Sequence, residues 1–335
     1  MVHMQQKTMR AVVISKPGGP EVLELRELPV PVPGKGEVRV RVHATAVNRV
    51  DLLQRIGAYP APADAPQDIP GIEYSGEIDA LGDGVTTFAP GDKVFGMCGG
   101  GAYAQYLTVH GRTVLRMPHD LSFNEAAAVP EAFITAYDAL FPQARLSPGE
   151  TLLIHAAGSG VGTAAIQLAV MHGVRVIGTA RTASKLEAAG ALGMHEGILL
   201  SEPDFTLEVL KLTGETGVDV VLELVGGPYL SEDLRCMAAG GRVVLVGLVA
   251  GASAEIDLAI VLRRRLEIRG TVLRVRPLEE KILLARSFSR HVVPFIKSGA
   301  LKPIIDRVFP LTEAAEAHRY LAGNESYGKV VLAVE

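Results

Sequence analysis

Three glycines at alternating positions, Gly158, Gly160 and Gly162, lie inside an otherwise apolar segment that reads TLLIHAAGSGVGTAAIQLAV from 151 to 170. The residues before them are typical of a buried strand, and those after them of a helix. A glycine turn between a strand and a helix brings backbone N–H groups and the positive helix end against a phosphate. The Gly-x-Gly-x-x-Gly spacing is incomplete because the sixth position is Thr163, so a tight structural turn is the alternative interpretation.

A second polar set, Arg181, Ser184 and Lys185, follows the next strand of this pattern, RVIGTA at 175–180. In NAD-binding proteins an acidic residue at this strand end binds the adenosine ribose, and here no acidic residue is present. Arginine binds a phosphate in a bidentate manner and lysine binds it as a point charge. The set therefore favours a 2′-phosphate, and NADP(H) over NAD(H), with a solvated helix start as the alternative.

Alternating strands and helices must position these residues. From about 124 an Ala-rich helical stretch, interrupted by Pro130, leads into predicted strands at 151–157, 175–180, 197–200, 218–226 and 241–249. Predicted helices begin at Val161 and cover 184–193, 205–214, 229–240 and 278–299. This alternation indicates a doubly wound α/β domain, a parallel sheet covered on both faces.

The part of the chain before 130 has a different texture. Short strands such as RAVVIS and EVRVRVHATAVN alternate with Pro- and Gly-rich turns such as PVPVPGKGE, which is typical of an irregular β domain. The tail SYGKVVLAVE, 326–335, also has strand character. We expect it to rejoin the first domain, because a lone strand needs a sheet to pair with.

Composition limits the function classes. A chain of 335 residues has room for about two domains. Its net charge of -4 gives no general attraction to nucleic acid or anionic membranes, and no apolar run reaches the ~20 residues of a membrane span. Two cysteines, Cys98 and Cys236, fit the reducing cytoplasm. The first eight residues are expected to be a leader without structure.

The order of several segments resembles one family. The segments NRVDLLQR, GAYP, GGGAYAQYLTV, PEAFITAY, GSGVGTAAIQL and YGKVVL follow one another along nearly the whole chain. In this order they resemble the zinc-independent quinone oxidoreductases (zeta-crystallin-like) of the medium-chain dehydrogenase/reductase superfamily. The likeness is closest to the tumour-suppressor-inducible quinone oxidoreductase branch.

The resemblance implies an architecture and a cofactor. It implies a GroES-like β catalytic domain at 1–130 and 300–335, a Rossmann domain at 131–299, and a site in the cleft between them. It also implies NADPH, and a homodimer in which the cofactor-domain sheets join edge to edge.

The resemblance also implies roles for individual residues. Asn48 and Tyr59 would line the nicotinamide and substrate site, and Thr135 would touch the cofactor near the nicotinamide. The remaining cofactor contacts would be Ser159, Gly160, Val161 and Gly162 at the diphosphate, Ser184 and Lys185 at the 2′-phosphate, and Gly247 and Leu248 at the nicotinamide amide. Where the family often has a tyrosine that helps hold the adenosine phosphate, this chain has Leu200, so its NADPH preference is expected to be weaker.

Zinc-dependent relatives carry a catalytic cysteine and a Gly-His-Glu where this chain has Asn48 and Gly71-Ile72-Glu73. Isoleucine cannot ligate a metal, so we predict no metal and no Lewis acid to polarise an alcohol. Hydride donation to an acceptor that is already electrophilic, a quinone or an activated alkene, remains possible. Tyr59 and Asn48 could hydrogen-bond the developing oxyanion, or Tyr59 could act as a lid and Asn48 could stabilise a loop.

Three hypotheses follow for the function. The first is an NADPH-dependent quinone oxidoreductase, the second an ene reductase acting on enones or enoyl thioesters, and the third a non-catalytic NADPH-binding structural or sensor protein. Two residues are expected to be structural, His155 as a packed histidine inside a strand and Cys98 as a small buried side chain. The basic run RRRLEIRG, 263–270, is expected to end a helix before an edge strand.

Overall fold

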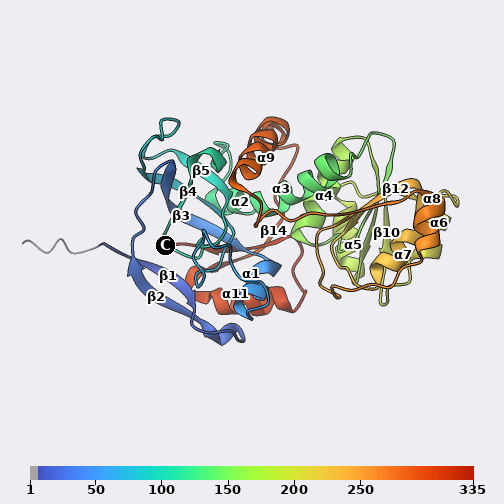
Figure 1. The fold of residues 1–335 in the computed structure, drawn as a ribbon, viewed down its shortest axis with the longest axis horizontal. Coiled ribbons are helices and arrows are strands. Elements are labelled where there is room, and N and C mark those ends of the chain that lie inside the picture. The colour runs from blue at the N-terminus through green and yellow to red at the C-terminus, as the bar shows by residue number, and fades with distance from the viewer. Residues whose placement is uncertain (1–6) are drawn as a thin grey trace, which may run out of the picture. The chain divides into compact units, whose positions relative to one another are not determined.

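The computed structural model describes residues 7–335, which divide into two compact units. The first unit consists of Met1–Ile134 and Leu273–Glu335, and the second of Thr135–Val272. Residues 1–6 of the expected leader lie outside the described residues, whereas Thr8 already belongs to the first strand. Figure 1 shows the ribbon with its helices and strands labelled.

The second unit is built on a six-stranded sheet in which every paired strand is parallel. Its order is β10-β9-β8-β11-β12-β13, the doubly wound arrangement that the alternating pattern predicts. The strands are β8 (Thr151–Ile154), β9 (Arg175–Ala180), β10 (Glu196–Leu199), β11 (Val218–Glu223), β12 (Met237–Leu245) and β13 (Glu267–Gly270). The carboxyl ends of these strands form one edge, where such sheets bind their ligands.

Helices connect these strands and bury an apolar core. They are α4 (Gly160–Met171), α5 (Ala183–Gly190), α6 (Thr206–Leu212), α7 (Tyr229–Cys236) and α8 (Leu258–Arg264). The predicted helix 229–240 ends early, because Met237 already pairs with Val218 of the neighbouring strand. The run at 263–270 is as expected, since α8 ends at Arg264 and β13 is an edge strand.

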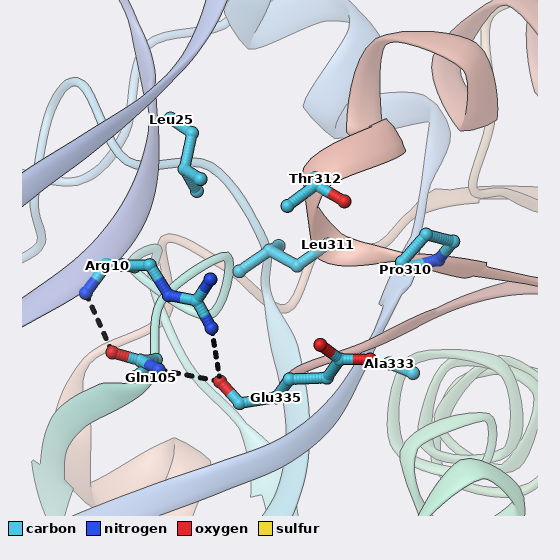
Figure 2. Close-up of a pocket in the computed structure, with 8 residues that line it drawn as sticks. All are labelled: Arg10, Leu25, Gln105, Pro310, Leu311, Thr312, Ala333 and Glu335. Carbon is cyan, nitrogen blue, oxygen red and sulfur yellow. Dashed lines mark hydrogen bonds between the residues drawn. The ribbon is translucent and has the colours of Figure 1, made fainter.

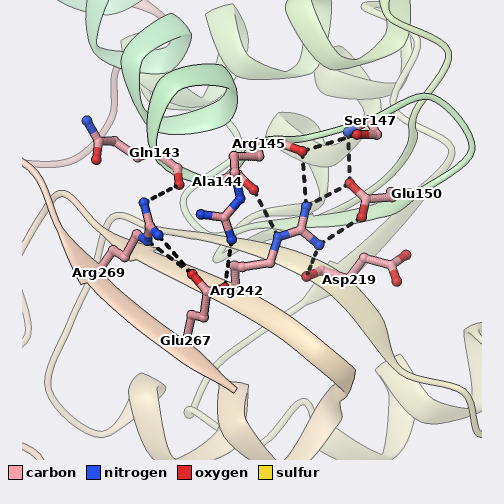
Figure 3. Close-up of polar contacts among 9 residues, drawn as sticks. All are labelled: Gln143, Ala144, Arg145, Ser147, Glu150, Asp219, Arg242, Glu267 and Arg269. Atoms are coloured by element: carbon pink, nitrogen blue, oxygen red, sulfur yellow. Dashed lines mark hydrogen bonds and ion pairs between the residues drawn. The ribbon is translucent and has the colours of Figure 1, made fainter. Parts of the chain in front are cut away.

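A buried arginine, Arg242, holds the opposite edge of this sheet together (Figure 3). Its guanidinium makes a bidentate ion pair with Glu150 at 2.8 and 2.9 Å. The same group donates to the main-chain oxygen of Ala144 at 2.9 Å, next to the π-helical turn η3 (Ala139–Gln143). The guanidinium thus joins β12, the start of β8 and the segment that follows α3 (Pro130–Asp138).

The first unit contains two β-sheets. A two-stranded sheet pairs β1 (Thr8–Ile14) with β2 (Leu23–Pro29), and a seven-stranded sheet runs β14-β15-β3-β4-β5-β7, with β6 paired to β3. The remaining strands are β3 (Glu37–Val47), β4 (Glu73–Leu81), β5 (Lys93–Met97), β6 (Tyr106–His110), β7 (Leu115–Arg116), β14 (Ile305–Pro310) and β15 (Lys329–Ala333). The first helices are α1 (Arg49–Arg55) and α2 (Phe123–Ala127), with single turns η1 (Pro20–Val22) and η2 (Gly111–Thr113).

The tail of the chain completes the larger sheet, as its strand character predicts. β15 lies between β14 and β3, and its residues Lys329–Leu332 are buried. After it, the main-chain oxygen of Glu335 accepts hydrogen bonds from Arg10 at 3.1 Å and Gln105 at 2.6 Å (Figure 2). Arg10, Gln105 and Glu335 line the small pocket of Figure 2. Because their hydrogen bonds fix the tail, we assign this pocket to the anchoring of the tail and not to a ligand.

The long C-terminal helix differs from the prediction. The stretch 278–299 forms two helices, α9 (Leu278–His291) and α10 (Val293–Lys297), because Pro294 has no N–H to continue the hydrogen bonds of a single helix. Both belong to the first unit, which begins again at Leu273 rather than at 300. An ion pair between Arg112 and Glu279, 2.8 Å, ties α9 to η2. The last helices are η4 (Leu311–Glu313) and α11 (Ala314–Ala322).

No helix in the described part of the chain is long and apolar enough to cross a membrane.

Candidate active site and cofactor site

The glycine turn lies at the carboxyl end of β8, the central strand of the second unit. Ser159 caps α4, its Oγ accepting from the N–H of Gly162 at 3.0 Å. A Cβ on Gly162 would lie 2.6 Å from the Ala156 oxygen, so close approach of helix and turn requires this glycine. The N–H groups of Gly160 and Val161 have no recorded acceptor among the described residues. These free first-turn donors fit a diphosphate.

The predicted 2′-phosphate residues lie at the start of α5, after β9. Arg181 and Ser184 are exposed, and Lys185 is half-buried. A Cβ on Gly158 would lie 3.0 Å from Cδ of Lys185, so the lysine stem packs against the glycine turn. The structure therefore places this cationic set beside the diphosphate candidate, at the same edge of the sheet. Leu200 is buried, and its apolar side chain offers a phosphate no hydrogen bond.

Other predicted cofactor residues lie at the ends of β12 and α3. A Cβ on Gly247 would lie 2.3 Å from the Leu224 oxygen, so only glycine fits there. Leu248 is 54% exposed and lines a small apolar pocket with Gly226 and Leu230. Thr135 is buried, and its Oγ1 finds no hydrogen-bond partner among the described residues. The cofactor roles of these residues stay predictions.

A buried polar trio, His155, Asp233 and Glu223, lies near the glycine turn. His155 is fully buried, as expected for a packed histidine, with Nε2 at 2.8 Å from Asp233 and Nδ1 at 2.9 Å from Thr179. One Glu223 oxygen accepts from the N–H groups of Val225 and Gly226, at 2.5 and 2.9 Å. This is the one grouping of three potential metal ligands among the described residues.

Burial sets the protonation of this trio. It raises the pKa of Asp233 to about 8 and that of Glu223 to about 7, and lowers the pKa of His155 to about 4. At neutral pH the contact between His155 and Asp233 is thus a hydrogen bond with a neutral imidazole, and not an ion pair. One oxygen of each carboxyl group lies within 4.8 Å of the other group, and the negative charge of Asp233 also raises the pKa of Glu223.

In the first unit, Asn48 belongs to a buried charge network. Lys329 Nζ donates to the Asn48 side-chain oxygen at 2.5 Å and to Glu73 at 2.7 Å. The Asn48 amide nitrogen donates to Glu73 at 2.8 Å and to the Ala46 oxygen at 3.2 Å. The second Glu73 oxygen accepts from the N–H of Glu131 at 2.8 Å. The sequence alone does not reveal this network, and its one signal is Lys329, a lone charge in an apolar strand.

The network uses every hydrogen-bonding group of the Asn48 side chain. Asn48 also precedes α1 and forms a capping box with Asp51. These contacts fit the second role considered for Asn48, which is to stabilise a loop. A contact between Asn48 and a substrate stays a prediction. Ile72, the neighbour of Glu73, is buried and apolar.

Tyr59 lies in the irregular segment after α1. Its side chain is half-buried, and its ring centre lies 5.7 Å from the guanidinium carbon of Arg274. No recorded hydrogen bond within the described residues involves its hydroxyl, which is therefore available as a donor. Nearby, Cys98 donates weakly to the Gly71 oxygen at 3.5 Å, and burial raises the pKa of its thiol to about 12. Cys98 is partly exposed and not the buried side chain expected, although its raised pKa keeps the thiol protonated at neutral pH.

Two family models match the chain. "Alcohol dehydrogenase GroES-like domain" matches residues 34–119, and "Zinc-binding dehydrogenase" matches residues 160–288. Human "Quinone oxidoreductase" is 35% identical over 330 residues, which cover 98% of each chain. The chain belongs to the medium-chain dehydrogenase/reductase superfamily. Its predicted fold, a GroES-like domain with a Rossmann domain, is confirmed.

Other members of the superfamily are similar over almost the full length. "2-haloacrylate reductase" from a Burkholderia species is 33% identical and covers 96% of this chain and 98% of its own. A solved quinone oxidoreductase from Pseudomonas syringae has a TM-score of 0.88 at 30% identity, and the match covers 97% of this chain and 99% of that one. A solved NAD-dependent alcohol dehydrogenase has a TM-score of 0.85 at 38% identity, and the match covers 98% of this chain and 100% of that one. The chain is thus an oxidoreductase of the type that binds a nicotinamide cofactor.

Proposed function

We propose that this medium-chain oxidoreductase is an NADPH-dependent quinone oxidoreductase that needs no metal. The observation that carries the proposal is the network of Asn48, Glu73 and Lys329. The Lys329 ammonium, 2.7 Å from Glu73, already supplies the positive charge at that carboxylate. A divalent cation there would face like-charge repulsion, and neither Asn48 nor Ile72 is a ligand that would compensate for it.

The lack of metal ligands at Asn48 and Ile72 limits which acceptor can be reduced. NADPH supplies a hydride when bound, and without a Lewis acid the acceptor must itself be electrophilic. A quinone meets this condition, and the relatives named quinone oxidoreductase support this choice. Tyr59 would donate a hydrogen bond to the oxygen that gains charge. The quinone takes up the hydride and one proton and becomes a hydroquinone.

The cofactor preference rests on the residues at the start of α5. Arg181, Ser184 and Lys185 offer two cations and a hydroxyl, and no carboxylate at the end of β9 competes with a 2′-phosphate. The similar NAD-dependent alcohol dehydrogenase makes this preference worth testing directly. We further propose a homodimer joined at the edge strand β13, which sedimentation at two protein concentrations would test.

A second candidate is an ene reductase, which the similarity to 2-haloacrylate reductase favours. An alkene takes a hydride at one carbon and a proton at the next, so it needs a proton donor. The Tyr59 hydroxyl, which has no recorded partner among the described residues, is our candidate for this donor in the predicted site.

The test is the loss of nicotinamide absorbance with NADPH or NADH and a panel of acceptors: a para-quinone, an ortho-quinone, an alkenal and a haloacrylate. Quinone turnover that prefers NADPH and persists after chelation supports the proposal. Turnover of the alkenes alone supports the ene reductase. NADPH binding without any turnover supports a non-catalytic role.

A further inference from the structure

Arg274 is a buried cation held in a fixed orientation inside the first unit. It lies between β13 and α9, in a segment without regular structure, and is 5% exposed. Its Nε donates to the Gly99 oxygen at 2.7 Å, and one terminal nitrogen donates to the Gln54 side-chain oxygen at 2.6 Å. Both acceptors are neutral. They orient the guanidinium without balancing its charge.

The other terminal nitrogen of Arg274 has no hydrogen-bond partner among the described residues, although it is buried. The Asp51 carboxylate attracts the Arg274 guanidinium electrostatically. Its oxygens, however, already accept hydrogen bonds from the N–H groups of Asn48 and Gly71, at 2.8 and 3.1 Å. Burial raises the pKa of Glu131 to about 8, so at neutral pH that side chain carries no full negative charge. A buried guanidinium remains charged, and an unpaired buried charge is costly unless a ligand pairs with it.

Arg274 lies next to a residue predicted to line the site of the acceptor. The ring of Tyr59, the residue predicted to line the substrate site, lies over the guanidinium. On another side lies the Gly99–Gly101 stretch, where a Cβ on Gly99 would be 3.0 Å from Ala65. The free nitrogen is buried, so a ligand reaches it only when neighbouring side chains move. The Tyr59 ring over the guanidinium is half-buried and lies outside any helix or strand, so it is the side chain we expect to move.

We propose that Arg274 binds an anionic group, a carboxylate or a sulfonate, carried by the acceptor that is reduced. This inference rests on the proposed function and narrows its substrate class to acidic conjugated acceptors. Guanidinium and carboxylate form a charge-assisted hydrogen bond, stronger than a neutral one. The anion would supply the charge that Arg274 lacks, and the neutral contacts to Gly99 and Gln54 would keep the guanidinium in place.

The test compares an ortho-naphthoquinone with the same quinone carrying a sulfonate. For each enzyme we would measure kcat/KM with both acceptors and take the ratio of the acidic to the neutral one, which cancels the intrinsic reactivity of the acceptors. We expect Arg274→Gln to lower this ratio by about 10- to 100-fold and Arg274→Lys to restore part of it. The matched control is Arg286→Gln, which removes the same charge at an exposed position on α9, and it should affect both acceptors alike.

A second measurement needs no turnover. Benzoate should raise the melting temperature of the wild-type protein and of Arg286→Gln, and much less that of Arg274→Gln. An unchanged acceptor ratio together with equal benzoate shifts in all variants overturns the inference, leaving Arg274 as a structural link. If no quinone is reduced by the wild type but the benzoate shift depends on Arg274, the proposed function fails and the anion site stands.

Discussion

Replacing Asp233 by asparagine should stabilise the protein at neutral pH, although Asp233 is a hydrogen-bond partner of His155. Burial raises the pKa of Asp233 from 3.8 to about 8, so at pH 7 the folded state holds a proton that the unfolded chain releases. Each pH unit above 3.8 costs the folded state about 1.4 kcal/mol, or about 4 kcal/mol at pH 7 as an upper bound. The Asp233 contribution to stability is full below pH 4 and is lost as the pH rises to 8.

Asparagine avoids this cost because its amide needs no proton. The oxygen can accept from His155 Nε2, and the NH2 group faces the nearby Glu223 without adding a negative charge. We expect Asp233→Asn to equal the wild type near pH 4 and to exceed it by an amount that grows toward pH 8. The assay is urea unfolding by circular dichroism at several pH values, since the chain has no tryptophan. Glu187→Gln, an exposed change on α5, is the control and should show no such trend.

One outcome would refute this reasoning directly. If Asp233→Asn is less stable than the wild type at pH 7 by an amount that is the same from pH 5 to 9, Asp233 is ionised and His155 is its charged partner. The trio would then be a buried ion pair, and its loss would leave one charge uncompensated.

Three further predictions follow from other contacts. Lys185→Ala should weaken NADPH binding about 10-fold and NADH binding much less, as measured by fluorescence titration, and equal losses would remove the 2′-phosphate role. Tyr59→Phe should lower kcat more for an alkenal than for a quinone if the hydroxyl is the proton donor, and a uniform loss would leave only a positioning or lid role. Arg242→Met should lower the free energy of unfolding by about 2 to 3 kcal/mol, because it leaves Glu150 unpaired. Arg263→Met, at an exposed position, should have little effect, and similar losses for both variants would contradict the role of the Arg242 contacts.

Local patterns in the sequence were sufficient for much of the fold. The alternation of strands and helices, the strand 175–180 and the return of the tail to the first unit could all be predicted, because each depends on neighbouring residues. The end of α7 could not. The stretch Met237–Gly240 has no strong preference, and pairing with β11 makes it a strand.

The candidate site was predictable only in part. Its glycine turn and cationic set are local patterns, since each lies within a few residues of a strand end. The link between Lys329 and Glu73 joins positions 256 residues apart, and no local pattern reports such a contact. Arg274 was missed for the same reason. Its partners Gln54 and Gly99 come from distant segments, and an arginine in a loop is usually exposed.

The order of the strands has a consequence for how the protein is made. The second unit is one continuous stretch that ends at Val272, so all of its residues are synthesised before the first unit is complete. β15, which lies between β14 and β3 in the larger sheet, comes last in the chain order of the strands. At usual translation speeds it follows Val272 by roughly 3 to 11 seconds. During that interval Glu73 has been made without Lys329, so the growing chain carries an unbalanced carboxylate until its final strand inserts.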